Sequence, residues 1–274
     1  MKIAIIYNTK FPYTTGFYCE KALIQLGHEV EHIEHNVSVS SKFDFFLNVD
    51  DDVPYFLQEK MRPNVYWVSD THRANHQWRF DKCNKADILF VSQKDALLQF
   101  QKTREKVFWM PHACDISYHS SNVAEKKYDI GFVGNISSRF HIRRKKMIEV
   151  LKKNFENVKF VDGLYLNDMA DLYRSSKIVF NCSLNNDINM RLFEGMCSGS
   201  MVLTDEIPYL FEVVDRDSIV TYRDENELVD KARYYLDCGY ERKQIALKGF
   251  FDVRSKHTYE HRMKDLVSIV QGNI

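Results

Sequence analysis

The chain has 274 residues, which is enough for two domains of ordinary size that each bury their own core. Lys+Arg and Asp+Glu both total 38, so the formal net charge is zero and no overall basic field indicates binding to nucleic acid or anionic lipid. No apolar run approaches the ~18 residues that cross a bilayer, and the first residues lack the pattern of a signal peptide. The six cysteines show no Cys-x-x-Cys spacing, which favours reduced thiols, and we expect a cytoplasmic protein.

The first half of the sequence alternates short apolar runs with helical or loop segments. A helix is expected between the first two runs, ending at Leu26–Gly27, because glycine suits a helix end. Short strands separated by helices are typical of a parallel α/β sheet. The predicted strands are Lys2–Tyr7, Gly27–Ile33, Phe43–Leu47, Val65–Val68, Ile88–Val91 and Lys106–Met110. The polar stretch Asp115–Lys127 has no clear periodicity and is expected to be a linker.

The second half repeats this alternation, although the two halves share no repeated sequence. Its predicted strands are Tyr128–Val133, Val158–Val161, Ile178–Phe180, Met201–Leu203 and Ser218–Thr221. Its predicted helices are a basic helix that ends near Asn154, then Asn167–Ser175, Glu225–Cys238 and an amphipathic tail helix at His257–Val270. A second parallel α/β sheet is therefore expected.

The stretch from Asn181 to Asp205 carries the strongest indication of function. A polar loop follows an apolar strand and leads into a helix that ends at Gly199, after which another strand begins. The unpaired N–H groups and partial positive charge of a helix N-terminus suit a phosphate group. The residues at this helix start are Asn185, Asn186 and Asp187, which can cap it, and Asn189, Arg191 and Glu194 in its first turns.

A cation and a carboxylate beside such a helix end fit a nucleoside diphosphate. Arg191 suits the phosphate oxygens, because a guanidinium can donate two parallel hydrogen bonds, and Glu194 suits the ribose hydroxyls. The alternative is that Arg191 and Glu194 form an i,i+3 ion pair on the protein surface.

Residues 193–204, Phe-Glu-Gly-Met-Cys-Ser-Gly-Ser-Met-Val-Leu-Thr, resemble the E-A-x-A-x-G-x-x-V-x-T run of glycosyltransferases with the GT-B fold. The version with Asn189-Met-Arg-Leu-Phe-Glu194 is most similar to the spore-maturation, CgeB-like branch of the group 1 transferases. The resemblance implies an α/β protein of two Rossmann-like, doubly wound parallel-sheet domains that face each other across a cleft, at residues 1–118 and 124–256. It also implies that the C-terminal helix, residues 257–274, packs back on the first domain.

The same resemblance assigns further residues to the sugar donor. The turn after the strand at 128–133 implies that Gly134 and Asn135 face the diphosphate, since a glycine lets the backbone approach a ligand. Arg139 is then the expected phosphate ligand, with Arg143 or Arg144 as substitutes. For these arginines the alternative is a solvated basic face of a helix.

Two more features bear on the donor. Leu164 and Tyr165 lie in the loop that borders the nucleotide base in the resembling family. The alternative interpretation of Tyr165 is that it packs on an ordinary part of the protein surface. Retaining GT-B enzymes often carry a Glu-x7-Glu pair. Glu194 matches the second glutamate, but Asn186, with Asp187 beside it, stands at the first position. The stereochemical outcome, retaining or inverting, is therefore left open.

Candidates for the acceptor side lie in the first half. Asp70 and His72 follow a strand, where α/β sheets place ligands, and they are the expected general base and acceptor-orienting groups. The alternative to a catalytic role for Asp70 is that its side chain caps the following helix. Thr15 and Gly16 resemble the acceptor-side loop of GT-B enzymes. His112 is expected near the crossing between the domains, with a structural histidine as the alternative.

We therefore predict a cytoplasmic glycosyltransferase that moves a sugar from a nucleoside-diphosphate sugar to an acceptor hydroxyl, without a cofactor or a metal ion. The alternatives are a catalytically decayed nucleotide-binding or regulatory protein of the same fold, and a sugar-nucleotide epimerase or phosphorylase. The three residues Asp50–Asp52 could be a metal-binding carboxylate motif, but an acidic loop is the simpler interpretation. The acceptor, whether glycan, lipid-linked sugar, protein or modified nucleic-acid base, is left open, as is the oligomeric state.

Overall fold

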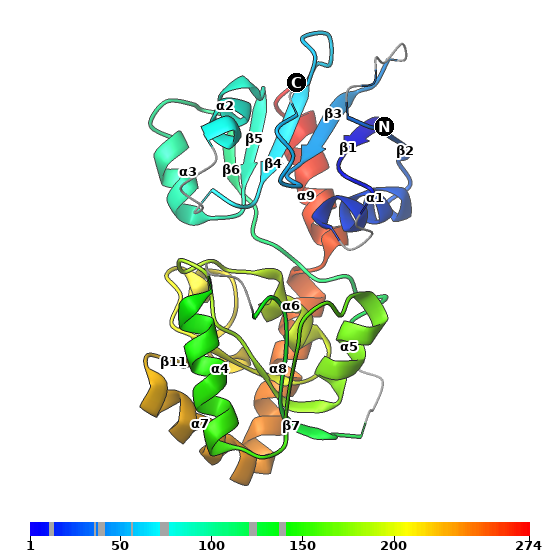
Figure 1. The fold of residues 1–274 in the computed structure, drawn as a ribbon. Coiled ribbons are helices and arrows are strands. Elements are labelled where there is room, and N and C mark those ends of the chain that lie inside the picture. Colours follow the sequence, from blue (N-terminus) through cyan, green and yellow to red (C-terminus); the bar gives the residue numbers. More distant parts are fainter. Residues whose placement is uncertain are drawn as a thin grey trace. The chain divides into compact units, whose positions relative to one another are not determined.

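The computed structural model describes residues 1–10, 14–35, 37, 42–55, 57–71, 77–120, 125–136 and 141–274. The chain divides into two compact units (Figure 1). Unit 1 comprises Met1–Pro111 and Tyr259–Ile274, and unit 2 comprises His112–Thr258. The first long segment of unit 1 thus ends at Pro111, before the predicted domain end at residue 118. Each unit is built on a parallel sheet, so the predicted α/β fold class is confirmed.

Unit 1 contains a parallel sheet with the strand order β2-β1-β3-β4-β5-β6. Its strands are β1 (Lys2–Ile6), β2 (Glu29–His32), β3 (Phe45–Val49), β4 (Asn64–Val68), β5 (Ile88–Val91) and β6 (Val107–Trp109). Its helices are α1 (Thr15–Gln25), α2 (Gln77–Lys85), α3 (Lys94–Phe100) and α9 (Tyr259–Gln271). The inner strands β3 and β5 are buried along their whole length, because helices cover both faces of a parallel sheet. The edge strand β2 instead alternates exposed and half-buried residues.

Helix α9 belongs to unit 1 although most of the chain separates it from the other elements of that unit. It lies beside α1, and the rings of Tyr18 and Tyr259 stack with their centroids 5.0 Å apart (Figure 1). Nε of Arg262 donates a hydrogen bond of 2.8 Å to the carbonyl oxygen of Pro111. The buried side chains Met263 and Leu266 complete the apolar face of the helix.

Unit 2 contains a parallel sheet with the strand order β11-β10-β9-β7-β8. Its strands are β7 (Tyr128–Val133), β8 (Val158–Val161), β9 (Ser176–Phe180), β10 (Met201–Asp205) and β11 (Val220–Tyr222). Its α-helices are α4 (Ile142–Asn154), α5 (Leu166–Arg174), α6 (Met190–Cys197), α7 (Glu225–Asp237) and α8 (Gly239–Lys256). Two 3-10 turns, Leu210–Glu212 and Arg216–Ser218, lie between β10 and β11.

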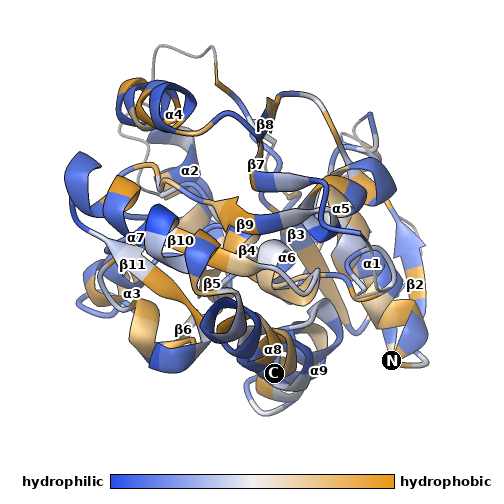
Figure 2. Ribbon diagram, turned by 90° about the horizontal axis from the view of Figure 1, so that it is seen from below, coloured by the Kyte–Doolittle hydropathy of each residue, from blue (hydrophilic) through white to orange (hydrophobic). Residues whose placement is uncertain are grey.

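The core of unit 2 is rich in aromatic side chains, and the ring of Phe180 lies within 6.1 Å of both Phe132 and Tyr222, measured between centroids. Inner strands such as β9 are mainly apolar, whereas helices such as α4 and α8 carry both apolar and hydrophilic residues (Figure 2). The predicted linker at Asp115–Lys127 is not a boundary between the units, because it falls within unit 2. Its His119 is fully buried, with Nδ1 3.2 Å from the hydroxyl oxygen of Ser198.

Within the described residues, no helix combines the length and the apolar character that a membrane span requires.

Candidate functional site

The order of the strands in unit 2 points to one end of the sheet. The strands that follow β7 in sequence lie on opposite sides of it, with β8 on one side and β9 on the other. In open α/β sheets, ligands bind beyond the carboxyl ends of the strands at such a switch point. The segments that leave these ends are the Gly134–Asn135 turn after β7 and the Asn181–Asn189 segment that leads from β9 into α6. The sequence-predicted donor residues of these two segments are therefore neighbours.

Arg191, in the first turn of α6, joins the two segments. Its Nε donates to the carbonyl oxygen of Val133 (2.8 Å), and its Nη1 donates to Oδ1 of Asn181 (2.6 Å). The guanidinium carbon lies 4.4 Å from the centroid of the Phe132 ring. Gly134 has a φ of +146°, and a Cβ built there would overlap Nη2 of Arg191. The glycine is thus needed both for its backbone conformation and for the closeness of the guanidinium.

Arg144, on α4, is a second arginine at the same place. It is buried, and its Nε and Nη2 donate to the carbonyl oxygen of Cys182 (3.2 and 3.0 Å) while Nη1 donates to that of Asn135 (3.2 Å). Its guanidinium carbon lies 5.6 Å from the centroid of the Phe132 ring, which Arg191 also contacts. Burial, and then the charge of Arg191, lower the pKa of Arg144 to about 10.

Neither arginine is neutralised by direct contact. Among the described residues, the hydrogen-bond partners of Arg144 and Arg191 are carbonyl and amide oxygens and the hydroxyl of Tyr173, and none of them is a carboxylate. Two neighbouring cations without a bonded anion disfavour each other, and an anionic ligand removes that cost. The arrangement therefore suits a ligand with more than one negative charge, such as a diphosphate.

Glu194, one turn further along α6, is a buried carboxylate. Burial raises its pKa to about 7, against a smaller lowering by the charge of Arg191. In the described part of the chain nothing donates a hydrogen bond to this carboxylate, and Nε2 of His119 lies 3.9 Å from Oε1. Burial lowers the pKa of His119 to about 3, so that imidazole is neutral at pH 7 and the contact is not an ion pair. The surface ion pair between Arg191 and Glu194 is not what the structure shows.

The start of α6 leaves a second polar group without a partner. Asn189 occupies the N-cap position but its side chain makes no capping hydrogen bond, and its buried amide nitrogen and oxygen have no partner among the residues that the structure describes. Before it, Asn185 and Asn186 have φ values of +52° and +62°, a left-handed conformation that asparagine tolerates. Oδ1 of Asp187 accepts a hydrogen bond from the backbone N–H of Leu184, which closes this loop.

The remaining donor candidates differ in their surroundings. Arg143 pairs with the fully buried Asp205 (2.5 Å), so the substitute that reaches the switch point is Arg144 and not Arg143. Leu164 is half-buried, and Tyr165, just before α5, has an exposed fraction of 42%. Arg139 lies outside the described residues.

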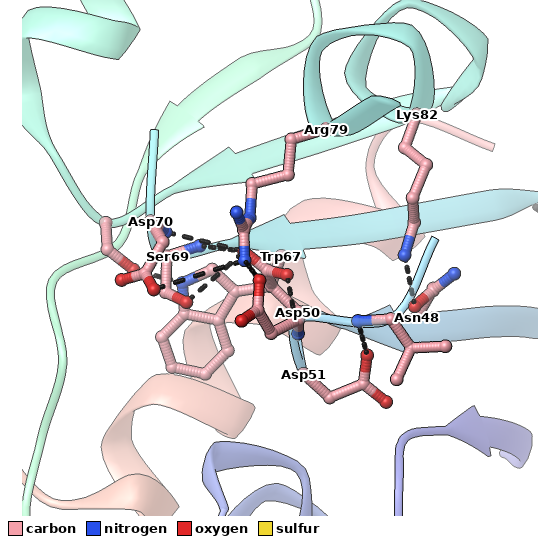
Figure 3. Close-up of polar contacts among 11 residues, drawn as sticks. Asn48, Asp50, Asp51, Trp67, Ser69, Asp70, Arg79 and Lys82 are labelled. Atoms are coloured by element: carbon pink, nitrogen blue, oxygen red, sulfur yellow. Dashed lines mark hydrogen bonds and ion pairs between the residues drawn. The ribbon is translucent and has the colours of Figure 1, made fainter. Parts of the chain in front are cut away.

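Unit 1 has a corresponding cluster at the carboxyl ends of β3 and β4 (Figure 3). Asp50 is buried and accepts hydrogen bonds from Nε of Arg79 (2.7 Å) and from the backbone N–H groups of Ser69 (3.2 Å) and Asp70 (3.4 Å). Burial acts to raise the pKa of Asp50, but the charge and hydrogen bond of Arg79, together with the charge of Lys82 and the N–H of Ser69, lower it overall. Arg79 also bonds Asp52 (2.7 Å), and it lies 4.0 Å from the Asp70 carboxylate.

Asp50–Asp52 do form an acidic loop after β3, but Asp50 is an internal partner of Arg79 and accepts a hydrogen bond from the backbone of Asp70. Sequence reasoning missed Arg79, because it lies on α2 with no motif around it. Among the described residues, no group of three or more His, Cys, Asp or Glu side chains is placed to hold a metal ion. His72 lies outside the described residues.

The other acceptor-side candidates have structural neighbours. Thr15 and Gly16 form the first turn of α1, and a Cβ at Gly16 would overlap the ring of Tyr7. This close packing explains the glycine without a ligand. His112 is buried and belongs to unit 2.

Comparison with known proteins places the chain in a family. Residues 122–268, more than half of the chain, match the model of the glycosyl transferase-like family. The fold is the Rossmann-like GT-B fold of glycosyltransferases, and the chain belongs to the glycosyl transferase-like family. The match does not distinguish the CgeB-like branch. No curated protein matches the chain in sequence.

Solved structures show the same fold at low sequence identity. HepE from Anabaena in complex with UDP and glucose has a TM-score of 0.71 at 12% identity, over 99% of this chain and 100% of that one. A sucrose-phosphate synthase from Thermosynechococcus elongatus has a TM-score of 0.69 at 9% identity, over 99% and 98% of the two chains. An alpha-glucosyltransferase in complex with UDP-glucose and DNA containing an abasic site has a TM-score of 0.67 at 11% identity, over 99% of each chain.

Proposed function

We propose that this protein transfers a sugar from a nucleoside-diphosphate sugar to an acceptor hydroxyl, with the donor held at the switch point of unit 2. The observation that carries the proposal is the meeting of two carboxylate-free arginines, Arg144 and Arg191, with the unbonded buried carboxylate of Glu194. Arginines of this kind suit a diphosphate, and a carboxylate that lacks donors suits a pair of ribose hydroxyls. The UDP and UDP-glucose named for HepE and the alpha-glucosyltransferase make uridine the first nucleoside to test.

The chemistry follows from where charge develops. Breaking the bond between sugar and phosphate leaves negative charge on the departing diphosphate. Arg144, Arg191 and the N-terminus of α6 are already in place and need no rearrangement to stabilise that charge. Because their attraction grows as the bond breaks, they lower the barrier and do not merely tighten substrate binding. Positive charge from these groups supplies what a divalent ion supplies elsewhere, so we infer that transfer is metal-independent.

Further donor contacts are assigned to Gly134, Asn135 and Asn189, with Leu164 and Tyr165 at the base. Asn189 has the strongest support, because its amide group is buried without a partner and can bond a sugar hydroxyl or a phosphate oxygen. Asn186 and Asp187 occupy the place of the first glutamate of the family motif, and they are assigned to the donor sugar.

The acceptor is assigned to unit 1, where Asp70 follows β4 at the carboxyl edge of the sheet. The Asp50–Arg79 pair fixes the backbone of this segment, which suits a side chain that must meet an acceptor hydroxyl in a defined position. Asp70 is proposed to accept the proton of that hydroxyl, with His72, Thr15, Gly16 and His112 as the other acceptor-side candidates. The sugar, the acceptor class and the stereochemistry are outcomes for experiment.

The test is a thermal-unfolding screen with UDP, UDP-glucose, GDP, ADP, CMP and dTDP, in buffer containing EDTA. One diphosphate at 100 times its dissociation constant should add about 2.7 kcal/mol of stability. Arg144→Ala should abolish the shift, whereas Lys145→Ala, the exposed neighbour on the same helix, should retain it.

No shift with any nucleotide would contradict the proposed donor site. A shift that requires Mg²⁺ would contradict the metal-independent mechanism. Binding without transfer or hydrolysis of the sugar nucleotide would instead identify a nucleotide-binding protein of the same fold.

A further inference from the structure

A small polar pocket lies in unit 1, apart from the groups assigned to transfer. It is lined by Asn48, Leu57, Asn64, Tyr66, Lys82 and Lys85. Asn48 belongs to β3, Asn64 and Tyr66 to β4, and Lys82 and Lys85 to α2. The space open to the centre of a water molecule is ≈ 20 Å³, more than the ~10–15 Å³ that a single water needs. Lys85 is exposed and marks the side that opens to solvent.

Helix α2 carries two buried cationic side chains, Arg79 and Lys82, whose partners differ. Arg79 bonds the carboxylates of Asp50 and Asp52. Lys82, one turn later, is also buried, and among the described residues the hydrogen-bond acceptor of its ammonium is Oδ1 of Asn48, at 3.5 Å, which Figure 3 shows beneath it. The ammonium also lies over the rings of Tyr66 and Trp78, at 4.6 and 5.4 Å from their centroids. Burial lowers the pKa of Lys82, and the opposing charges of Asp50 and Asp51 do not compensate for it.

Two residues that line the pocket each carry a polar atom without a partner in the described part of the chain. One is the hydroxyl of Tyr66, whose side chain has an exposed fraction of 1%. Oδ1 of Asn64 is likewise buried and unbonded. A buried hydroxyl or amide oxygen that lacks a partner costs ~1–3 kcal/mol, so three unsatisfied or weakly satisfied groups on one cavity indicate an occupant.

We propose that this pocket binds a free tetrahedral oxyanion of the phosphate class. The Lys82 ammonium supplies the positive charge and the Tyr66 hydroxyl donates to an oxygen of the ion. A protonated oxygen of hydrogen phosphate donates to Oδ1 of Asn64, which completes the three groups. A cation, a donor and an acceptor around a cavity of this size match such an ion, whereas a divalent cation is repelled by Lys82.

The test measures unfolding temperature in sodium phosphate and in sodium chloride of equal ionic strength, with wild type, Tyr66→Phe and Lys82→Met. In chloride, Tyr66→Phe should unfold at the wild-type temperature or above, because the lost hydroxyl has no partner. In phosphate, it should bind the ion at least about tenfold more weakly, and Lys82→Met should lose the phosphate-dependent shift. Tyr259→Phe, which removes a buried hydroxyl of unit 1 outside the pocket, should keep the full shift.

Phosphate that binds at the arginines of unit 2 contributes equally to all four proteins, so the difference between them reports the pocket alone. If Lys82→Met does not fold, Tyr66→Phe decides the question by itself. Equal phosphate-dependent shifts in wild type and Tyr66→Phe would show that the pocket holds water only and would overturn the proposal. The outcome is independent of nucleotide binding.

Discussion

Replacement of Glu194 by glutamine separates a ligand-binding role from a structural one. In the folded protein the Glu194 carboxylate is buried, its pKa is raised to about 7, and no described group donates to it. Because the raised pKa means that the folded state binds the proton more tightly than the unfolded chain does, protonation stabilises the fold. The stabilisation is complete below the ordinary pKa of 4.5 and is lost as the pH rises towards 7.

The size of the effect follows from the difference between the two pKa values. A pKa raised from 4.5 to about 7 corresponds to about 3 kcal/mol, at ~1.4 kcal/mol per pKa unit. Glu194→Gln has no proton to lose, so it should be as stable as the wild type near pH 4.5. At pH 8 it should be more stable, by up to about 3 kcal/mol.

The assay is urea unfolding of wild type and Glu194→Gln at several pH values between 4.5 and 8. Glu149→Gln is the control, because it removes an exposed carboxylate of the same unit. The difference between Glu194→Gln and wild type should grow with pH, whereas the Glu149→Gln difference should stay near zero. The same Glu194→Gln protein should bind UDP more weakly at pH 8, since it no longer offers a carboxylate to the ribose hydroxyls.

One result would refute this reasoning. If Glu194 served to hold His119 in an ion pair, its replacement would destabilise the protein at neutral pH, because a partner would be left unpaired. A loss of stability at pH 8 in Glu194→Gln would therefore show that the neighbourhood of His119 is structural, and the assignment of Glu194 to the ribose would fail.

Three further changes test the remaining groups. Gly134→Ala should raise the Kd for UDP at least tenfold (about 1.4 kcal/mol), because the added Cβ would displace the guanidinium of Arg191. Gly163→Ala is the control: Gly163 also has a positive φ, but an added Cβ there would meet no atom within 4 Å, so the Kd should not change. Calorimetric titration with UDP measures both values. Arg191→Ala should lower kcat by ~10²-fold, about 2.7 kcal/mol, and unchanged turnover in a folded variant would remove Arg191 from the mechanism. Asp50→Asn should cost about 3–5 kcal/mol in urea unfolding, since it leaves Arg79 buried without its charge partner; a change below about 1 kcal/mol would contradict the internal pairing.

Much of the fold could be predicted from the sequence because its signals are local. The strands predicted at Tyr128–Val133 and Val158–Val161 have those bounds in the structure. A short apolar run of strand length is enough to predict a buried strand without knowledge of the rest of the chain. Helix α8, in contrast, was not predicted. Its pattern is obscured by exposed apolar side chains such as Leu247 and Phe251, and Gly249 sits mid-helix where a Cβ would crowd the carbonyl oxygen of Ser218.

The candidate site was predictable where its residues share one segment. Asn189, Arg191 and Glu194 follow one another at a helix start, and the helix-end argument needs no knowledge of the rest of the chain. Arg144 and Arg79 meet their neighbours only through the sheet topology: Arg79 lies 29 residues from Asp50, and Arg144 lies 38 from Cys182. No local pattern encodes such distant pairs, so Arg144 could not be preferred over Arg143 from local sequence.

The placement of α9 also affects the order in which the protein is completed during synthesis. Unit 2 is one continuous stretch, so every residue of it exists once Thr258 has been made. Unit 1 begins first, yet the Tyr18 face of α1 has no partner until Tyr259–Gln271 emerges. The N-terminal unit is therefore finished last, and until then it presents an uncovered apolar surface to the chaperones and proteases of the cell.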